Sequence, residues 1–285
     1  MYIPSSAELN KLNKSPSAPT TPRIIQDEYT VEGIRVERYR LAELKHPTSL
    51  PPIVCVHGGG QASWCWEDFA PPLVAAGFEV HALNWLGRNG SASIEDDVFL
   101  KMSIVDVVSD IAKVAKQLAA PFILVGHSMG GLACQLYAQD NEVKALLLMT
   151  PVVPSQVNAA VVELPIDHSA PWGPVPFQQA KELFFQGLNE EQCRHFYQKL
   201  VPESPLRCFE ATRWTLPVKI EQITMPTLIV SGQLDYLTPQ PVGRRLAELF
   251  GAEYRVESDL GHNVLLGKRG AEVAASLVPW ILSKI

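Results

Sequence analysis

From Pro52 onward, short apolar segments alternate with longer segments in which apolar residues recur at helical spacing. Ile53–Val56, Phe122–Val125 and Val143–Met149 are segments of the first kind, and Met129–Gln139 is one of the second. Strands that are apolar throughout are buried on both faces, which is typical of a parallel sheet covered by helices. The alternation therefore predicts an α/β fold.

The alternation stops in a proline-rich stretch, residues 151–222, that carries helix-like segments at Phe177–Gly187 and Glu190–Leu200, and it resumes afterwards. An insertion of about 70 residues is too long for a simple loop in a compact domain. We therefore expect residues 151–222 to form a helical cap on a core made of residues 25–150 and 223–285.

The amino-terminal residues differ in composition from this core. Residues 1–24 are polar and rich in serine and proline, which disfavours a helix, so we expect a flexible arm. Two segments with strand character follow, Asp27–Val31 and Ile34–Leu41, and Glu32-Gly33 separates them. A two-residue connection that contains glycine predicts a β-hairpin.

Composition narrows the partners and the compartment. No apolar run reaches the length of a membrane span, which needs about 20 residues, and residues 1–22 lack the apolar region of a secretory signal. The formal net charge of −6 comes without a cluster of lysine and arginine, so we expect neither a nucleic acid nor a membrane as partner. The five cysteines lack metal-ligand or paired spacing, and Cys55 and Cys134 lie in apolar segments. We expect a cytoplasmic protein without metal or cofactor that acts on a small molecule; no feature indicates an oligomeric state.

The segment Gly126-His127-Ser128-Met129-Gly130 lies directly between a predicted strand and a predicted helix. A sharp strand-to-helix turn holds its central residue in a strained conformation, and residues two positions away on either side must lack a side chain. The start of the helix also places partial positive charge beside the serine. G-x-S-x-G occurs by chance in unrelated proteins, but this context indicates that Ser128 is a catalytic nucleophile.

A serine nucleophile needs a general base within hydrogen-bond reach and an acid that orients the base. The three residues are expected in the order serine, acid, histidine along the chain, each in a loop after a strand. Asp235 follows the apolar segment Thr227–Val230, and His262 follows the next strand-like segment. Glu257 and Asp259 are closer to His262 in the sequence, but an orienting carboxylate normally comes from the loop of the neighbouring strand. We favour Asp235 as the acid and His262 as the base.

The chain has six other histidines that are alternatives to His262 as the general base. We expect His57 to brace its own loop by hydrogen bonds and His127 to point away from the serine. The remaining four have no metal-site spacing and are expected in a strand or on the surface; they are His46, His81, His168 and His195.

Acyl transfer builds negative charge on the carbonyl oxygen, which backbone N–H groups stabilise. One donor is expected from Met129, at the start of the helix after the serine. The second is expected from the glycine run after Ile53–Val56, with Gly59 as the first candidate and Gly60 as its rival.

Together these segments resemble the α/β-hydrolase superfamily, in the branch of small hydrolases with an H-G-x-G loop and a G-H-S-M-G-G elbow. The resemblance covers roughly residues 28–285. It implies an eight-stranded, mostly parallel sheet, a cap after the sixth strand, and Ser128, Asp235 and His262 as a catalytic triad. It also implies that Met129 and Gly59 supply the oxyanion hole.

One segment departs from the family pattern. Many relatives carry an aspartate and then R-G-x-G-x-S after the fourth strand, where this chain has Asn84-Trp85-Leu86-Gly87-Arg88-Asn89-Gly90-Ser91. The changed residues alter the expected floor of the active site. Trp85 is either a wall of the acyl pocket or an aromatic residue of the core.

The expected cap is rich in aromatic residues, which favours an apolar substrate. We expect Trp85, Trp172 and Trp214 to contact it, with further candidate walls at Trp64, Trp66, Phe177, Phe184, Phe185 and Phe196. The sequence thus predicts a serine hydrolase of small or medium apolar carboxylic esters, and the serine argues against the aspartate-dependent dehalogenases and epoxide hydrolases. Fold alone leaves alternatives open: C–C bond hydrolysis, lyase or cofactor-free oxygenase chemistry, or a ligand-binding receptor with little turnover.

Overall fold

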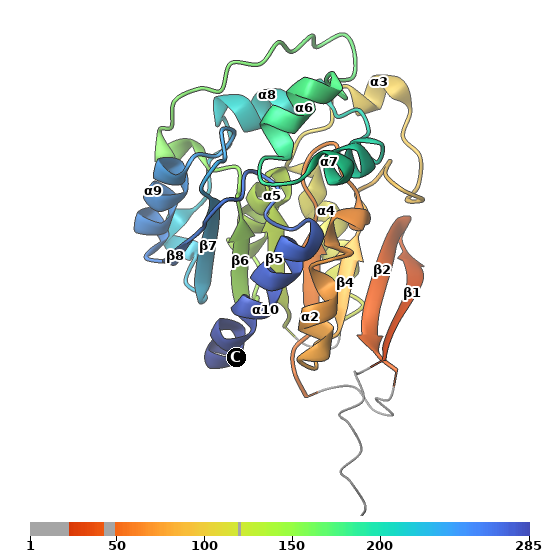
Figure 1. Ribbon diagram of the computed structural model, residues 1–285, viewed down its shortest axis with the longest axis vertical. Coiled ribbons are helices and arrows are strands. Elements are labelled where there is room, and N and C mark those ends of the chain that lie inside the picture. The colour runs from red at the N-terminus through yellow and green to blue at the C-terminus, as the bar shows by residue number, and fades with distance from the viewer. Residues whose placement is uncertain (1–22, 43–48, 119–120) are drawn as a thin grey trace, which may run out of the picture.

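Eight strands form one sheet in the order β1-β2-β4-β3-β5-β6-β7-β8 in the computed structural model, which describes residues 23–42, 49–118 and 121–285 (Figure 1). The strands are β1 (Ile24–Val31), β2 (Ile34–Leu41), β3 (Ile53–Val56), β4 (Val80–Leu83), β5 (Ile123–His127), β6 (Ala145–Met149), β7 (Thr227–Gly232) and β8 (Glu253–Glu257). β2 pairs antiparallel with β1 and β4, and the pairs from β4 to β8 are all parallel. The predicted eight-stranded, mostly parallel sheet is confirmed.

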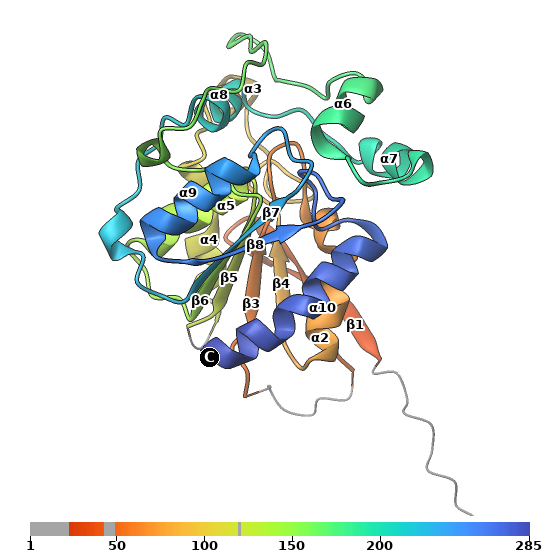
Figure 2. The same ribbon diagram turned by 60° about the vertical axis from the view of Figure 1, so that its left-hand side comes forward.

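Helices cover both faces of this sheet (Figure 2). The helices are α2 (Ala70–Ala75), α3 (Asp96–Phe99), α4 (Asp106–Ala115), α5 (Met129–Ala138), α6 (Phe177–Phe184), α7 (Glu190–Tyr197), α8 (Pro205–Arg213), α9 (Gln240–Phe250) and α10 (Gly267–Lys284). α2 packs with α10 on one face, while α4, α5 and α9 pack on the other. In the part of the chain that the structure describes, no helix is long and apolar enough to cross a membrane.

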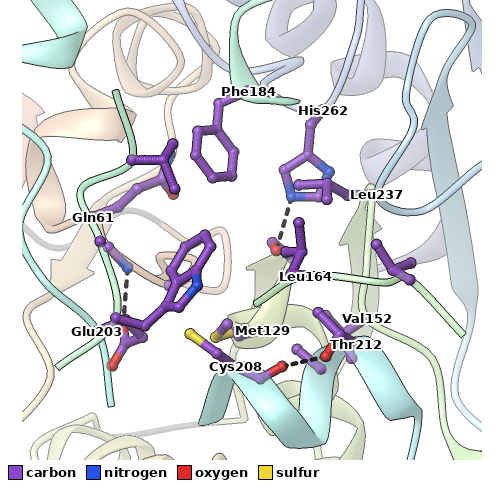
Figure 3. A pocket seen from close by; sticks show the side chains of 18 of the residues that line it. Gln61, Met129, Val152, Leu164, Phe184, Glu203, Cys208, Thr212, Leu237 and His262 are labelled. Atoms are coloured by element: carbon purple, nitrogen blue, oxygen red, sulfur yellow. Dashed lines mark hydrogen bonds between the residues drawn. The ribbon is translucent and has the colours of Figure 1, made fainter. Parts of the chain in front are cut away.

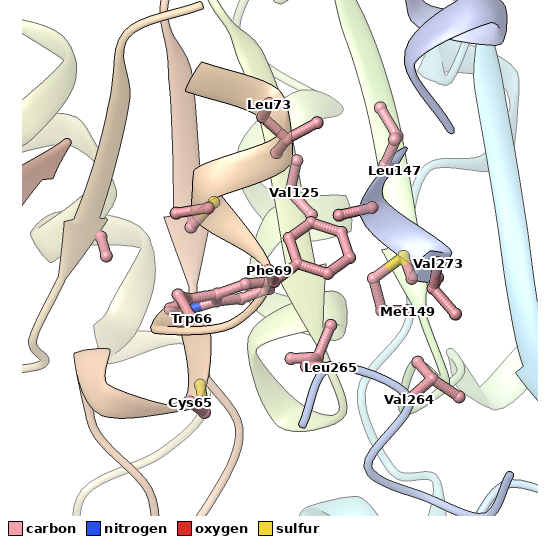
Figure 4. Packing of buried hydrophobic residues seen from close by; sticks show 14 of the residues in the cluster. Cys65, Trp66, Phe69, Leu73, Val125, Leu147, Met149, Val264, Leu265 and Val273 are labelled. Carbon is pink, nitrogen blue, oxygen red and sulfur yellow. The ribbon is translucent and has the colours of Figure 1, made fainter. Parts of the chain in front are cut away.

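The central strands are apolar at most positions because their residues serve two cores in alternation. In β3, Ile53 and Cys55 belong to the cluster beneath α2 and α10, and Val54 and Val56 belong to the cluster beneath α4, α5 and α9. Successive strand side chains point to opposite faces, so a strand covered on both faces is apolar on both, with an occasional buried polar residue such as His81 of β4. Figure 4 shows the first cluster, in which Leu73 of α2 lies over Val125 and Leu147 of the sheet.

The hairpin at the edge of the sheet is also present. Its turn residues Glu32 and Gly33 have φ of 44° and 81°, which is the conformation of a two-residue turn that suits the twist of paired strands. β1 begins at Ile24, so the last residue of the expected arm belongs to the sheet. Residues 1–22 lie outside the described residues.

Residues 151–222 join β6 to β7 and are called the inserted segment below. They carry α6, α7 and α8, which lie beyond one end of the sheet in both views (Figures 1 and 2). The first two helices were expected and α8 was not, although it begins with Pro205 after the capping Ser204. Trp172 and Glu203 pair through two backbone hydrogen bonds, which join the stretch before α6 to the stretch before α8.

Candidate active site

Three loops that follow parallel strands meet at one edge of the sheet and bring the predicted triad residues together. Ser128 follows β5, Asp235 follows β7 and His262 follows β8. His262 Nε2 lies 2.9 Å from Ser128 Oγ (Figure 3). His262 Nδ1 lies 3.0 Å from Asp235 Oδ2. All three residues are buried. The distances are those of a base that is hydrogen-bonded to both a hydroxyl and an orienting acid.

The backbone at Ser128 has the strain that the sequence predicts. Its φ of 51° and ψ of −121° are unusual for a residue with a side chain. A Cβ at Gly126 would lie 2.6 Å from both Cys134 Sγ and Gly130 O, and one at Gly130 would lie 2.2 Å from His57 O. The glycines on both sides of the serine are therefore required for the close contact between strand, turn and helix.

We expect Gly130→Ala to lower the free energy of unfolding by at least about 3 kcal/mol, because its Cβ would overlap backbone atoms of two residues that cannot move apart cheaply. The matched control is Gly251→Ala, where φ is 60° but no atom lies within 4 Å of the added Cβ. That control should lose only about 1 kcal/mol, the cost of the backbone conformation. Urea denaturation compares the two, and equal losses would contradict the steric explanation.

Asp235 is held by its own loop as well as by the histidine. Its Oδ1 accepts the N–H groups of Leu237 and Thr238, and its Oδ2 accepts the hydroxyl of Thr238 at 2.6 Å. Burial acts to raise the pKa of this carboxyl, but His262 and the hydrogen bonds bring the pKa below its ordinary value. The carboxylate is therefore ionised at neutral pH and aligned with His262.

The two alternative acids lie elsewhere. Glu257 is at the end of β8, where it forms an ion pair with Arg255, and Asp259 is exposed. Within the described residues, neither of them bonds to His262. Asp235 is the carboxylate beside His262, as the strand order predicted.

The glycine loop after β3 leaves one N–H group unused. The N–H of Gly58 donates to Gln61 Oε1 at 3.1 Å, and the N–H of Gly60 donates to Glu203 Oε2 at 2.9 Å. The N–H groups of Gly59 and Met129 have no acceptor among the described residues. Of the two glycine candidates, Gly59 therefore has the free donor and its rival Gly60 does not.

His57 and His127 hold the loops together. His57 Nδ1 donates to Gly58 O at 2.8 Å, and its Nε2 accepts the N–H of Trp85. His127 Nδ1 lies 2.9 Å from Gln61 Oε1, and its Nε2 lies 3.0 Å from the carbonyl oxygen of His262. Burial lowers the pKa of each of these two histidines to about 3, so both are neutral near pH 7. Neither of them bonds to Ser128 Oγ, which is hydrogen-bonded to His262.

A cavity with an empty volume of about 840 Å³, including its mouth, opens above Ser128. The inserted segment supplies much of its wall, with Trp172 and Trp214 among the lining residues as expected, and Phe184 beside His262 (Figure 3). The indole N–H groups of the two tryptophans donate to backbone carbonyls, so their apolar surfaces remain for the cavity.

The expectation that Trp85 contacts substrate is wrong. Trp85 is fully buried below the loop, stacks on His57 with ring centres 4.3 Å apart, and does not line the cavity. Its backbone N–H and ring are used to support the glycine loop, so it belongs to the core. Five other aromatic candidates do not line the cavity either: Trp64, Trp66, Phe177, Phe185 and Phe196.

Three polar residues of the site were not found from the sequence. Gln61 Nε2 donates to Asn263 Oδ1 at 2.6 Å, which joins the glycine loop to the histidine loop. Glu203 comes from the inserted segment and is 1% exposed. Gln61 and Asn263 lie near recognised motif residues, which is a usable signal, whereas nothing in the sequence around Glu203 marks it. No group of His, Cys, Asp or Glu that suits a metal ion occurs among the residues described.

This sheet, with its strand-end loops and elbow, has the architecture of α/β hydrolases. The sequence profile of the alpha/beta hydrolase family matches residues 53–276. The chain belongs to this family.

Similar proteins are distant in sequence. A pheophorbidase of Raphanus sativus is 31% identical over 29% of this chain and 31% of its own length. Norfluorocurarine synthase 1 of Strychnos nux-vomica is 27% identical over 37% of this chain and 40% of its own length. The chain thus spans less than half the length of these curated relatives. Among solved structures, a thermophilic esterase has a TM-score of 0.68 at 17% identity, covering 92% of this chain and 98% of its own. The structure of an Arabidopsis methylesterase has a TM-score of 0.66 at 18% identity, and the match covers 82% of this chain and 100% of that chain.

Proposed function

We propose that the protein is a serine hydrolase that cleaves small or medium apolar carboxylic esters. The observation that carries the proposal is the continuous hydrogen-bond chain from Ser128 Oγ through His262 to Asp235. In this proposal Ser128 is the nucleophile, His262 the general base, and Asp235 its orienter. The names of relatives, which include esterases, support hydrolysis as the reaction class.

The reaction proceeds in two steps. His262 Nε2 takes the Ser128 proton while Oγ attacks the ester carbonyl, and the oxyanion accepts hydrogen bonds from Gly59 N–H and Met129 N–H. The intermediate collapses, the alcohol leaves with the proton from His262, and an acyl-enzyme remains. Water that His262 deprotonates then releases the acid and restores Ser128.

The cavity argues for an apolar substrate. Four of its side-chain donors are already used within the protein: besides the two indoles, Thr212 Oγ1 donates to Cys208 O and Thr238 Oγ1 donates to Asp235. A substituent that only accepts hydrogen bonds would lose water and find these donors occupied, which costs free energy. In this proposal the inserted segment acts as the cap that excludes water from the ester.

We expect the protein to hydrolyse p-nitrophenyl esters in a series from acetate to dodecanoate. The value of kcat/KM should rise by up to about fourfold for each methylene that the cavity accepts, since each buried methylene contributes about 0.8 kcal/mol. It should fall for chains that exceed the cavity. Absence of turnover on every ester would overturn the proposal. Diketone cleavage and saturable ligand binding without turnover, two of the alternatives that the fold leaves open, would then be measured.

A further inference from the structure

Glu203 is a buried acid on the cavity wall to which the proposed mechanism gives no role. It lies in the inserted segment just before α8 and is 1% exposed. Burying a carboxylate is costly unless its charge and its hydrogen bonds are satisfied. Its contacts therefore indicate what it does.

One contact is with the glycine loop. Glu203 Oε2 accepts the N–H of Gly60 at 2.9 Å (Figure 3). The carbonyl oxygen of Gly60 accepts the N–H of Val201 at 3.0 Å. The inserted segment thus binds both the N–H and the carbonyl oxygen of Gly60, although Glu203 is 143 residues away from Gly60 in the sequence.

Three consecutive glycines have little conformational preference of their own. Gly58 is held through its N–H by Gln61, and Gly60 is held by Glu203 and Val201. Gly59 lies between these two fixed residues, so the direction of its N–H depends on both. Loss of the Glu203 bond leaves Gly60 held only through its carbonyl oxygen by Val201, which loosens the peptide between Gly59 and Gly60 and widens the range of directions of the Gly59 N–H.

A carboxylate near the oxyanion would oppose the charge that develops there, and two arginines offset it. Arg88 Nη2 lies 2.7 Å and Arg207 Nη1 lies 3.4 Å from Glu203 Oε1. Burial acts to raise the pKa of Glu203, but the two guanidinium groups hold the pKa below its ordinary value. Arg88 also donates to the carbonyl oxygen of Pro202, and Arg207 lies over the Trp85 ring. The segment that departs from the family pattern thus supplies one of the arginines.

We propose that Glu203 is a positioning residue that holds Gly60 and thereby keeps the Gly59 N–H directed at the oxyanion. The inference rests on the proposed function, because it assigns a role within that reaction. It makes the oxyanion hole depend on correct docking of the inserted segment.

The test compares Glu203→Ala with Glu210→Ala. Glu210 is also a buried acid of the inserted segment, but its carboxylate accepts the Ile104 N–H and the Ser103 hydroxyl, away from the cavity. Both variants lose anchoring of the segment, and only the first loses the bond to Gly60. Glu203→Asp retains the charge beside the arginines but withdraws the carboxylate from Gly60 by one methylene, so it serves if Glu203→Ala does not fold.

In Glu203→Ala we expect kcat for the preferred ester to fall about ten- to a hundredfold with KM nearly unchanged, since a misplaced oxyanion donor acts in the transition state. Glu203→Asp should lose a smaller factor. Glu210→Ala should keep kcat within about threefold at a similarly lowered unfolding midpoint. Hydrogen exchange at the Gly60 amide should be faster in Glu203→Ala than in Glu210→Ala.

Unchanged kcat in both Glu203 variants would overturn the inference, as would an equal loss of kcat in Glu210→Ala. Failure of the proposed function is distinguishable, because the wild type would then hydrolyse no ester. In that case the rate at which a fluorophosphonate labels Ser128 decides, since that reaction also places negative charge on an oxygen in the hole. Labelling as fast in Glu203→Ala as in the wild type would refute the role.

Discussion

Replacing Ser128 with alanine is expected to remove at least about a thousandfold of ester hydrolysis while leaving the fold intact. The variant retains Cβ, so the strained backbone, with φ of 51°, is no worse than in the wild type. Its one lost side-chain contact is the 2.9 Å hydrogen bond to His262. The fraction of activity that remains would come from the oxyanion hole and from substrate binding.

The measurement is kcat/KM for the preferred p-nitrophenyl ester, with circular dichroism and urea denaturation to verify folding. Ser231→Ala is the matched control, because Ser231 is also buried at a strand end but does not line the cavity. It should retain activity within about threefold of the wild type. If Ser128→Ala kept a tenth of the wild-type activity, Ser128 would not be the nucleophile.

The sheet was predictable because its central strands carry one physical signal throughout their length. Ile53–Val56 is a strand with the bounds that the sequence predicted, since apolar residues at every position leave no other arrangement than burial on both faces. α3 and α8 were not predicted. α3 has four residues, none buried, and α8 contains Arg207 and Glu210, polar residues that tertiary contacts bury.

The candidate triad was predictable for a topological reason. Parallel strands direct their carboxyl ends to the same edge of the sheet, so polar residues that follow separate strands are brought together there. Contacts between distant segments carried no such signal. Glu203 pairs with Gly60 across 143 residues, and the burial of Trp85 depends on His57, which stacks on its ring, and on Arg207, which also lies over the ring.

Asp235→Asn is expected to lower kcat by about a thousand- to ten-thousandfold, although it changes one atom. The asparagine has a single oxygen, and the Leu237 and Thr238 N–H groups that now donate to Oδ1 require an acceptor. The amide nitrogen would then face His262 Nδ1 in place of Oδ2. An NH₂ group at that position favours the tautomer with the proton on Nε2, and a protonated Nε2 cannot take the proton of Ser128.

The matched control is Asp259→Asn, three residues before His262 in the chain and one of the two alternative acids. Asp259 has φ of 60°, a conformation that asparagine tolerates well, so this variant should fold normally. It should keep kcat within about twofold, because among the described residues its carboxylate does not bond to His262.

Steady-state kinetics on the preferred ester compares the two variants across pH. A large loss in Asp259→Asn together with a small one in Asp235→Asn would mean that a different carboxylate orients His262 during turnover. Similar losses in both would mean that the charge near His262 matters and its direct hydrogen bond does not. Loss confined to Asp235→Asn follows from the bonded geometry, in which one oxygen sets the tautomer of the base.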